Sequence, residues 1–373
     1  MQKTQKQIKE IRFSVIDSSL IIRKLDSGHV AFPDIVRLKN DSLLIAYREG
    51  IAHVDTQSRI TKQFGSPDGK SWSEPETLYD HPGIDDRDPS LEVLDNGYVI
   101  TNYFKYVRGS WYERPTLIHT FAGRSADNGK TFIPSVQVDE GELFTDSCYV
   151  SNDSVWVNSK GEVLQGFACS GAITKFGNRL LLPAYGGYPL VRRRNTLIFV
   201  SPLSTIALFE SNDNGSSWTK NRINIPGSDT VWLQEPSLLN LGDSLLLMHI
   251  RTANGKSIYD AGKMAQTISK DGGKTWSQIE FFPFTGHAPE LFRLSCGVIL
   301  CAFRYVNNEY TEESVAFIYS IDFGNTWSDP VFIEYCGEEE CGYPAFAELN
   351  DSTFMIVYYG NNGKTIKNSV FCY

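Results

Sequence analysis

Residues 233–252 read LQEPSLLNLGDSLLLMHIRT, and residues 269–276 read SKDGGKTW. The first stretch has an apolar run on each side of a Gly-Asp pair, which predicts two strands joined by a tight turn. The second stretch predicts another hairpin turn, because its Asp can hydrogen-bond the turn backbone and its second Gly can adopt a positive φ. Together the two stretches predict a small antiparallel sheet.

The strand-pair stretch recurs along the chain. The copies that share a proline before the first apolar run are AFPDIVRLKNDSLLIAYREG (31–50), DRDPSLEVLDNGYVITNYF (86–104), GHAPELFRLSCGVILCAFRY (286–305) and CGYPAFAELNDSTFMIVYYG (341–360). A more divergent copy, SGAITKFGNRLLLPAYGG (170–187), lacks that proline. We expect the prolines at 33, 89, 236, 289 and 344 at strand starts, where a missing N–H is tolerated. Such recurrence predicts a repeat architecture.

The turn motif alternates with the strand pairs. Its copies fit Ser-x-Asp-x-Gly-x-Ser/Thr-aromatic and read SADNGKTF (125–132), SNDNGSSW (211–218) and SIDFGNTW (320–327), with a degenerate form, GSPDGKSW (65–72). This motif resembles the Asp-box of sialidases and related bacterial neuraminidases, in which it holds turns together. The resemblance implies an all-β fold, a six-bladed β-propeller of four-stranded antiparallel blades. We expect residues 1–373 to form one such domain, closed by an outer strand from residues 11–24.

Charge and termini exclude several classes of function. A net charge of −9 argues against a general nucleic-acid or anionic-membrane binder, because phosphate contacts need a basic surface. The polar start MQKTQKQIKE lacks the apolar stretch of a signal peptide, and no apolar run reaches the ~18 residues of a membrane span. The sequence therefore predicts a soluble, cytoplasmic protein and gives no indication of its oligomeric state.

The sequence predicts neither a metal nor a cofactor. The seven cysteines show no C-x-x-C spacing, and no G-x-G-x-x-G motif opens a helix. Cys336 and Cys341 could pair across a loop, but we interpret all cysteines as free thiols. His and Asp residues are scattered without the spacing of metal ligands.

Candidate site residues follow from the repeat. Inner strands of a propeller line its axis, so polar residues near the repeat prolines should converge from different blades. These residues are Asp34, Arg87, Asp88, Glu235, His287 and Tyr343, and the second strands of three repeats end in Arg48, Arg251 and Arg304. Blade packing alone does not account for an arginine at that position in three repeats.

The resemblance to sialidases implies a role for four of these residues. The stretch 233–252 resembles the sialidase segment that contains the Glu partner of the nucleophile and an Arg of the carboxylate-binding triad. Residues 341–349, CGYPAFAEL, resemble the segment that carries the nucleophilic Tyr. The resemblance thus implies Tyr343 as nucleophile, Glu235 as acceptor of its proton, and Arg251 and Arg304 as ligands of a substrate carboxylate. A carboxylate nucleophile would be repelled by such a substrate, which is why sialidases use Tyr.

The sequence also departs from the sialidase pattern. Val30-Ala31-Phe32-Pro33 stands where sialidases have a triad Arg, and Arg48 or Arg87 could substitute for it. Sialidases carry the general acid in the loop that corresponds to His53 to Asp55 here. Asp34 and Asp88 compete with that loop, in which His53 is our candidate. His287 is a further candidate for binding substrate.

These observations predict an exo-acting glycoside hydrolase of sialidase-like type, with a carbohydrate substrate that ends in an acidic sugar. One alternative is a polysaccharide lyase, in which His53, His287 and Tyr343 act as base and acid on a uronate. The other is a non-catalytic propeller that binds a glycan or a protein. The Asp-boxes do not distinguish these functions, because non-enzymatic propellers contain them too.

Overall fold

The computed structural model describes residues 11–107, 117–139, 149–150, 156–157, 166–186, 190–193, 196–199, 205–254, 262–309 and 311–373. All regular elements in these residues are strands. Within them, no helix is long and apolar enough to cross a membrane.

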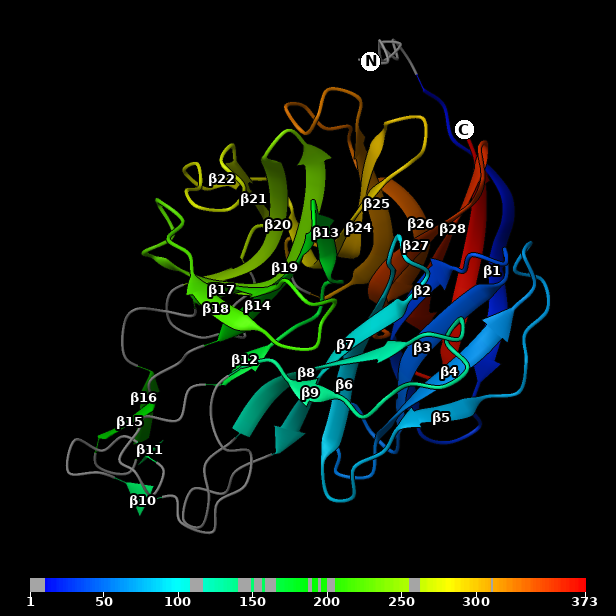
Figure 1. Ribbon diagram of the computed structural model, residues 1–373. Coiled ribbons are helices and arrows are strands. Elements are labelled where there is room, and N and C mark those ends of the chain that lie inside the picture. The colour runs from blue at the N-terminus through cyan, green and yellow to red at the C-terminus, as the bar shows by residue number, and fades with distance from the viewer. Residues whose placement is uncertain are drawn as a thin grey trace.

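The strands form six small antiparallel sheets around an axis, the six blades of a propeller (Figure 1). Blade 1 consists of β2 (His29–Arg37), β3 (Leu43–Gly50), β4 (Arg59–Gly65) and β5 (Glu76–Tyr79). Blade 2 consists of β6 (Asp85–Val93), β7 (Val99–Val107), β8 (Leu117–Ser125) and β9 (Val136–Gln137). Blade 3 contains β12 (Phe167–Ala168), β13 (Thr174–Phe176), β14 (Arg179–Gly186), β17 (Thr205–Ser211) and β18 (Thr219–Arg222). The predicted all-β six-bladed propeller is thus confirmed.

The remaining blades follow the same order from the axis outward. Blade 4 consists of β19 (Val231–Gly242), β20 (Leu245–Asn254), β21 (Ala265–Ser269) and β22 (Glu280–Phe281). Blade 5 consists of β23 (Thr285–Arg293), β24 (Ile299–Val306), β25 (Glu313–Ser320) and β26 (Val331–Gly337). Blade 6 contains β27 (Gly342–Asn350), β28 (Thr353–Gly360) and β29 (Thr365–Cys372). Two further strand pairs are β10–β11 (Tyr149–Val150, Trp156–Val157) and β15–β16 (Leu190–Arg193, Thr196–Phe199).

The N-terminal strand closes the ring. β1 (Ser14–Lys24) pairs antiparallel with β29 and becomes the outer strand of blade 6, as predicted for residues 11–24. In Figure 1 the blue first strand accordingly lies beside the red end of the chain. This pairing gives blade 6 its fourth strand and joins the two ends of the described chain in one sheet.

The Asp-boxes connect the third and fourth strands of their blades. Asp127 accepts hydrogen bonds from Ser125 and Thr131, and Gly129 adopts a φ of 77°. The same contacts recur around Asp213, Asp271 and Asp322. Their predicted role in holding turns is therefore confirmed.

The hydrophobic core lies between adjacent blades. Val30 and Tyr47 of blade 1 pack with Tyr359 of blade 6 in one cluster, while Phe317 of blade 5 packs with Phe354 of blade 6 in another. These five side chains are fully buried between blades. Their burial therefore stabilises the contacts between adjacent blades. The axis itself remains available for polar side chains.

We expected the repeat prolines at the starts of their strands, and this prediction is wrong. Pro33, Pro89, Pro236, Pro289 and Pro344 lie inside the inner strands, each at a register shift against the second strand. A β-bulge leaves a residue out of the ladder, so a proline without an N–H is tolerated there. The residue before each proline therefore leaves the regular alternation of the strand.

A disulfide corrects our interpretation of the cysteines as free thiols. Cys336 and Cys341 are bonded, with 6.4 Å between their Cα atoms. The short loop between β26 and β27 brings both residues within bridging distance, which residue spacing alone left open. Cys169, Cys296, Cys301 and Cys372 are free, and Cys148 lies outside the described residues.

Thiol titration tests this bond. The denatured protein should show two more reactive thiols after reduction than before it. The Cys336→Ser variant should show no such difference, because its Cys341 has lost its partner. Equal counts for the unmutated chain before and after reduction would contradict the disulfide.

Candidate active site

The five bulges place equivalent residues of five blades around the axis. Their shared feature is a positive φ at the residue before the proline: 57° at Phe32, 46° at Asp88, 47° at Glu235, 46° at Ala288 and 47° at Tyr343. For residues other than glycine this conformation costs roughly 1–3 kcal/mol each, and such strain gathers at functional sites. Except for Glu235, these residues line one small cavity on the axis.

Tyr343 and Glu235 form the centre of this ring. The Tyr343 hydroxyl donates a hydrogen bond to Glu235 Oε1 at 2.6 Å, although the two residues come from blades 6 and 4. The Arg251 guanidinium donates to the same oxygen at 2.8 Å, and the Ala288 amide donates to Oε2 at 2.8 Å. Glu235 is only 4% exposed. These contacts hold the carboxylate as an acceptor for the tyrosine proton.

The environment of Tyr343 keeps its hydroxyl protonated in the resting protein. Burial raises its pKa well above the ordinary value, and the charges of Glu235 and Asp88 raise it further. Arg251 and Arg304 act in the opposite direction, because they favour the phenolate. The protonated hydroxyl of Tyr343 therefore donates its hydrogen to Glu235 in this structure.

Three arginines surround Tyr343. Arg304 lies over its ring, with 5.4 Å between the guanidinium carbon and the ring centre. Arg87 stacks on Phe32 at 4.9 Å, and the Phe32 ring lies 4.6 Å from that of Tyr343. Arg87 thereby reaches from blade 2 to the Phe32 ring of blade 1, while its guanidinium also binds Asp85 at 3.1 Å.

Arg48 shares the carboxylate of Asp85 with Arg87. Its side chain is fully buried, and its guanidinium donates to Asp85 at 2.7 Å and to Asp55 at 3.1 Å. It also donates to the Ala52 carbonyl at 2.9 Å, so Arg48 holds the loop that follows β3. All of these partners are protein groups.

Asp88 is the acidic residue best suited to donate a proton. It is 4% exposed, and its Oδ1 makes no hydrogen bond. Burial raises the pKa of Asp88 to about 7, with Arg87 lowering it and Glu235 raising it. The carboxyl group is therefore substantially protonated near neutral pH.

The loop 51–58 carries His53 and Asp55 but serves mainly to position neighbours. Asp55 accepts backbone hydrogen bonds from Ile51, Ala52 and Gln57, which bring its pKa below the ordinary value although burial acts to raise it. His53 contacts Arg87 through its carbonyl oxygen at 2.7 Å. An ionised Asp55 held by backbone amides is a poor proton donor.

His287 lies beside the arginines, as its position in blade 5 suggested. It is 9% exposed, and burial lowers its pKa well below the ordinary value, with Arg251 and Arg304 lowering it further. Its Nε2 atom has no hydrogen-bond partner. The neutral ring can therefore donate to, or accept from, a bound sugar hydroxyl.

Asp34 directly follows Pro33 of the first bulge and lines the small cavity on the axis together with Glu290. Its carboxylate accepts hydrogen bonds from the Leu91 amide at 2.6 Å and from the Ile35 amide at 2.7 Å. Burial raises its pKa to about 7, and burial with the charge of Asp34 raises the pKa of Glu290. Asp34 and Glu290 also line a separate cavity of about 530 Å³.

This buried carboxyl should make stability depend on pH. The folded protein holds the Asp34 proton to a pH of about 7, whereas the unfolded chain releases it near 3.8. The raised pKa of Asp34 therefore contributes stability to the folded protein that is fully present below pH 3.8. This contribution is lost as the pH rises through about 7. Between pH 5 and pH 8 we expect the thermal midpoint to fall by a few degrees.

The Asp34→Asn variant is the matched comparison. At pH 5 the thermal midpoint of this variant should be lower than that of the unmutated chain, because the amide NH₂ faces a backbone N–H. Between pH 5 and pH 8, however, its midpoint should fall less. Scanning calorimetry at both pH values measures this difference. An equal fall in both proteins would show that Asp34 does not carry the effect.

Several buried polar atoms around the ring lack partners. They are Asp88 Oδ1, Gln234 Oε1, Arg251 Nε, His287 Nε2 and Arg304 Nε. Leaving one such group unpaired costs about 1–3 kcal/mol, so their convergence favours a polar ligand. Gln234 and Arg87 also line an adjoining cavity of about 190 Å³ with Phe104 and Tyr185.

Our sequence reasoning missed Gln234, Glu340 and Tyr359. Gln234 stands two residues before Pro236, as Arg87 does before Pro89, so the repeat alignment could have found it. Glu340 and Tyr359 both bind Arg304, and Tyr359 donates to Glu340 at 2.6 Å. Their involvement depends on how blades 5 and 6 pack, which no repeat pattern indicates.

The comparison with known families agrees with this architecture. Residues 103–356 match the model of the BNR repeat-like domain, which is more than half of the chain. The chain belongs to this family. Membership of this family accounts for the repeat and for the propeller scaffold. It does not identify a substrate for this chain.

Solved structures show the same fold at low sequence identity. A protein of unknown function from Dyadobacter fermentans is 21% identical with a TM-score of 0.75, covering 96% of this chain and 99% of that one. The Hadza microbial sialidase Hz136 is 15% identical with a TM-score of 0.66, covering 91% and 65%. The intramolecular trans-sialidase of Ruminococcus gnavus is 12% identical with a TM-score of 0.62, covering 95% and 97%.

A curated relative covers a smaller part of the chain. The vacuolar protein sorting/targeting protein PEP1 of Saccharomyces cerevisiae is 27% identical over 157 residues. That match spans 38% of this chain and 10% of the yeast protein. The shared segment thus represents a small part of a much longer protein.

Proposed function

We propose that the chain is an exo-acting glycoside hydrolase of sialidase-like type that releases a terminal acidic sugar. The observation that carries this proposal is the 2.6 Å contact between the Tyr343 hydroxyl and Glu235, with Arg251 on the same carboxylate. A tyrosine paired with a buried base is the nucleophile suited to a substrate whose carboxylate would repel Asp or Glu.

In the first step Tyr343 Oη bonds to the anomeric carbon while its proton passes to Glu235. The bond from that carbon to the leaving oxygen breaks, and Asp88 gives its proton to that oxygen. In the second step water attacks the anomeric carbon, Asp88 accepts a proton from the water, and Tyr343 leaves and regains its proton from Glu235. The sum is hydrolysis with retained configuration.

The charge around Tyr343 supports an anionic substrate. Arg251, Arg304 and Arg87 present guanidinium groups that can bind a carboxylate through paired N–H donors. The unpaired Nε atom of Arg251 and the Nε2 atom of His287 are available to a ligand in the described part of the site. The arginines also stabilise the phenolate that forms when Tyr343 acts as leaving group.

A substrate screen tests the proposal. The purified chain should release the aglycone from at least one fluorogenic glycoside of an acidic sugar, such as a sialic acid or a uronic acid. The Glu235→Gln variant should lose about 10²–10⁴-fold in rate, because its amide cannot accept the tyrosine proton.

Two other outcomes would replace this function. Release of an unsaturated product from a uronate polysaccharide, detected by its ultraviolet absorbance, would indicate a lyase. Binding of a glycan or a protein that Glu235→Gln and Tyr343→Phe leave intact, without turnover, would indicate a non-catalytic propeller.

A further inference from the structure

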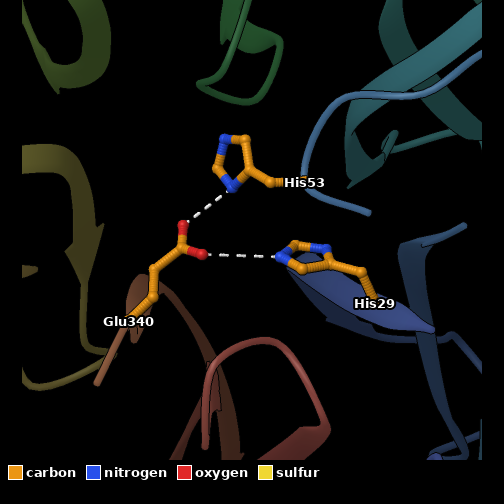
Figure 2. Close-up of side chains that lie close together, drawn as sticks. All are labelled: His29, His53 and Glu340. Carbon is orange, nitrogen blue, oxygen red and sulfur yellow. Dashed lines mark ion pairs between the residues drawn. The ribbon is translucent and has the colours of Figure 1, made fainter. Parts of the chain in front are cut away.

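A second cluster of polar side chains lies at the rim of the ring, outside the reacting residues. His29 comes from the start of β2, His53 from the loop after β3, and Glu340 from the loop between β26 and β27. Their ligand atoms, one from each residue, lie within 4.8 Å of one another. Figure 2 shows both imidazole rings directed at the Glu340 carboxylate, each toward a different oxygen.

The His29 ring is buried and directs its Nε2 atom toward Glu340. His29 is 5% exposed, and its Nε2 atom makes no hydrogen bond while lying 3.5 Å from Glu340 Oε2. Gly363 backs the ring so closely that a Cβ there would lie 2.4 Å from Nε2. The ring therefore has little freedom to turn its Nε2 atom away from Glu340.

The donor atoms of the cluster suit a divalent cation. Imidazole nitrogens together with a carboxylate oxygen are ligands that transition metals such as zinc accept.

The loop that carries Glu340 is held in place on both sides. The Cys336–Cys341 disulfide ends at the residue after Glu340, and the Glu340 amide donates to Asn362 at 2.7 Å. Glu340 is thus presented to the two histidines by a braced loop. A ligand held by a fixed backbone loses less entropy on binding a metal.

We propose that His29 Nε2, His53 Nδ1 and Glu340 together bind a divalent transition-metal ion, for which zinc is the best match. Two imidazole nitrogens and one carboxylate oxygen form a three-ligand zinc set that leaves a fourth position open. With bonds of about 2.0–2.2 Å, neighbouring ligand atoms in a tetrahedral site lie about 3.3 Å apart. The 2.8 Å contact between His53 and Glu340 must therefore lengthen, and the 43% exposed His53 side chain has room to move.

One neighbour must adjust when the ion binds. Arg48 Nη1 lies 3.5 Å from His29 Nδ1, and a metal on Nε2 requires a hydrogen on that Nδ1 atom. Arg48 can give up this long contact, because the same Nη1 atom donates to the Ala52 carbonyl at 2.9 Å. The ion would also draw charge from Glu340 and so weaken its 3.6 Å ion pair with Arg304.

Calorimetric titration of the full chain, first treated with a chelator, tests this site with Zn²⁺ and with Co²⁺ as a spectroscopic probe. We expect one equivalent of Zn²⁺ to bind and Co²⁺ to develop visible absorption. His29→Ala and Glu340→Gln should each weaken binding by at least about a hundredfold. Glu340→Gln is nearly isosteric, so circular dichroism should verify that its fold is unchanged.

The matched control is His81→Ala, because His81 pairs with Asp86 at 3.0 Å in a two-residue contact outside the cluster. This variant should bind Zn²⁺ like the unmutated chain. Absence of saturable binding, or binding that persists in a chain with His29→Ala and His53→Ala together, would overturn the proposal. The result is independent of glycosidase activity, since binding is measured without a sugar substrate.

Discussion

Tyr343→Phe should lower kcat by about a thousandfold or more on the glycoside that the chain hydrolyses, because the nucleophilic oxygen is removed. The fold should be kept, since the phenyl ring retains its contacts with Phe32 and with the guanidinium of Arg304. Steady-state kinetics of both proteins on the same substrate measure the effect. KM should change much less than kcat, because the carboxylate-binding arginines remain.

Tyr358→Phe is the matched control for this experiment. Tyr358 is another tyrosine of blade 6; it is fully buried, whereas Tyr343 is partly buried, and its hydroxyl bonds to Glu334 at 2.9 Å. Its loss should lower stability without a comparable loss of kcat. If Tyr343→Phe retained the rate of the unmutated chain, another residue would have to be the nucleophile.

Activity should fall about tenfold for each pH unit above 7, because Asp88 then loses the proton that it donates to the leaving oxygen. Burial raises the pKa of Asp88 to about 7, which places the change within the accessible pH range. Above that pH the fraction of protonated Asp88 falls in proportion to the proton concentration. The pH profile of kcat/KM reports ionisations of the free protein and the free substrate. It should therefore show the titration of Asp88.

Asp88→Asn should remove the alkaline limb of the profile and lower the rate at pH 6 by about 10²–10⁴-fold. The amide of asparagine keeps the shape of the side chain but holds no transferable acid proton. A substrate with an acidic leaving group should recover most of the rate, since its oxygen needs no proton. An unchanged alkaline limb in Asp88→Asn would mean that a different group titrates.

The sequence by itself determined the repeat, and with it the blades. Hairpin turns and Asp-boxes depend on local contacts, such as those of Asp127 with Ser125 and Thr131, so residue type and spacing suffice to predict them. The resemblance to sialidases also singled out Glu235 and Tyr343, and the structure brings these two residues into contact. Residues 11–24 were likewise predicted to close the ring, because an outer strand was missing from the last blade.

Only the tertiary structure decided which of the other candidates join that pair. Arg48 and Arg87 were equivalent substitutes in the sequence, and both bind Asp85, yet only Arg48 is also bound by Asp55 while Arg87 reaches Phe32. The bulges, the Cys336–Cys341 disulfide and the approach of His29 to Glu340 depend in the same way on packing between distant segments. The physical reason is that turn chemistry acts over a few residues, whereas burial, charge and side-chain direction at the axis are set by several blades at once.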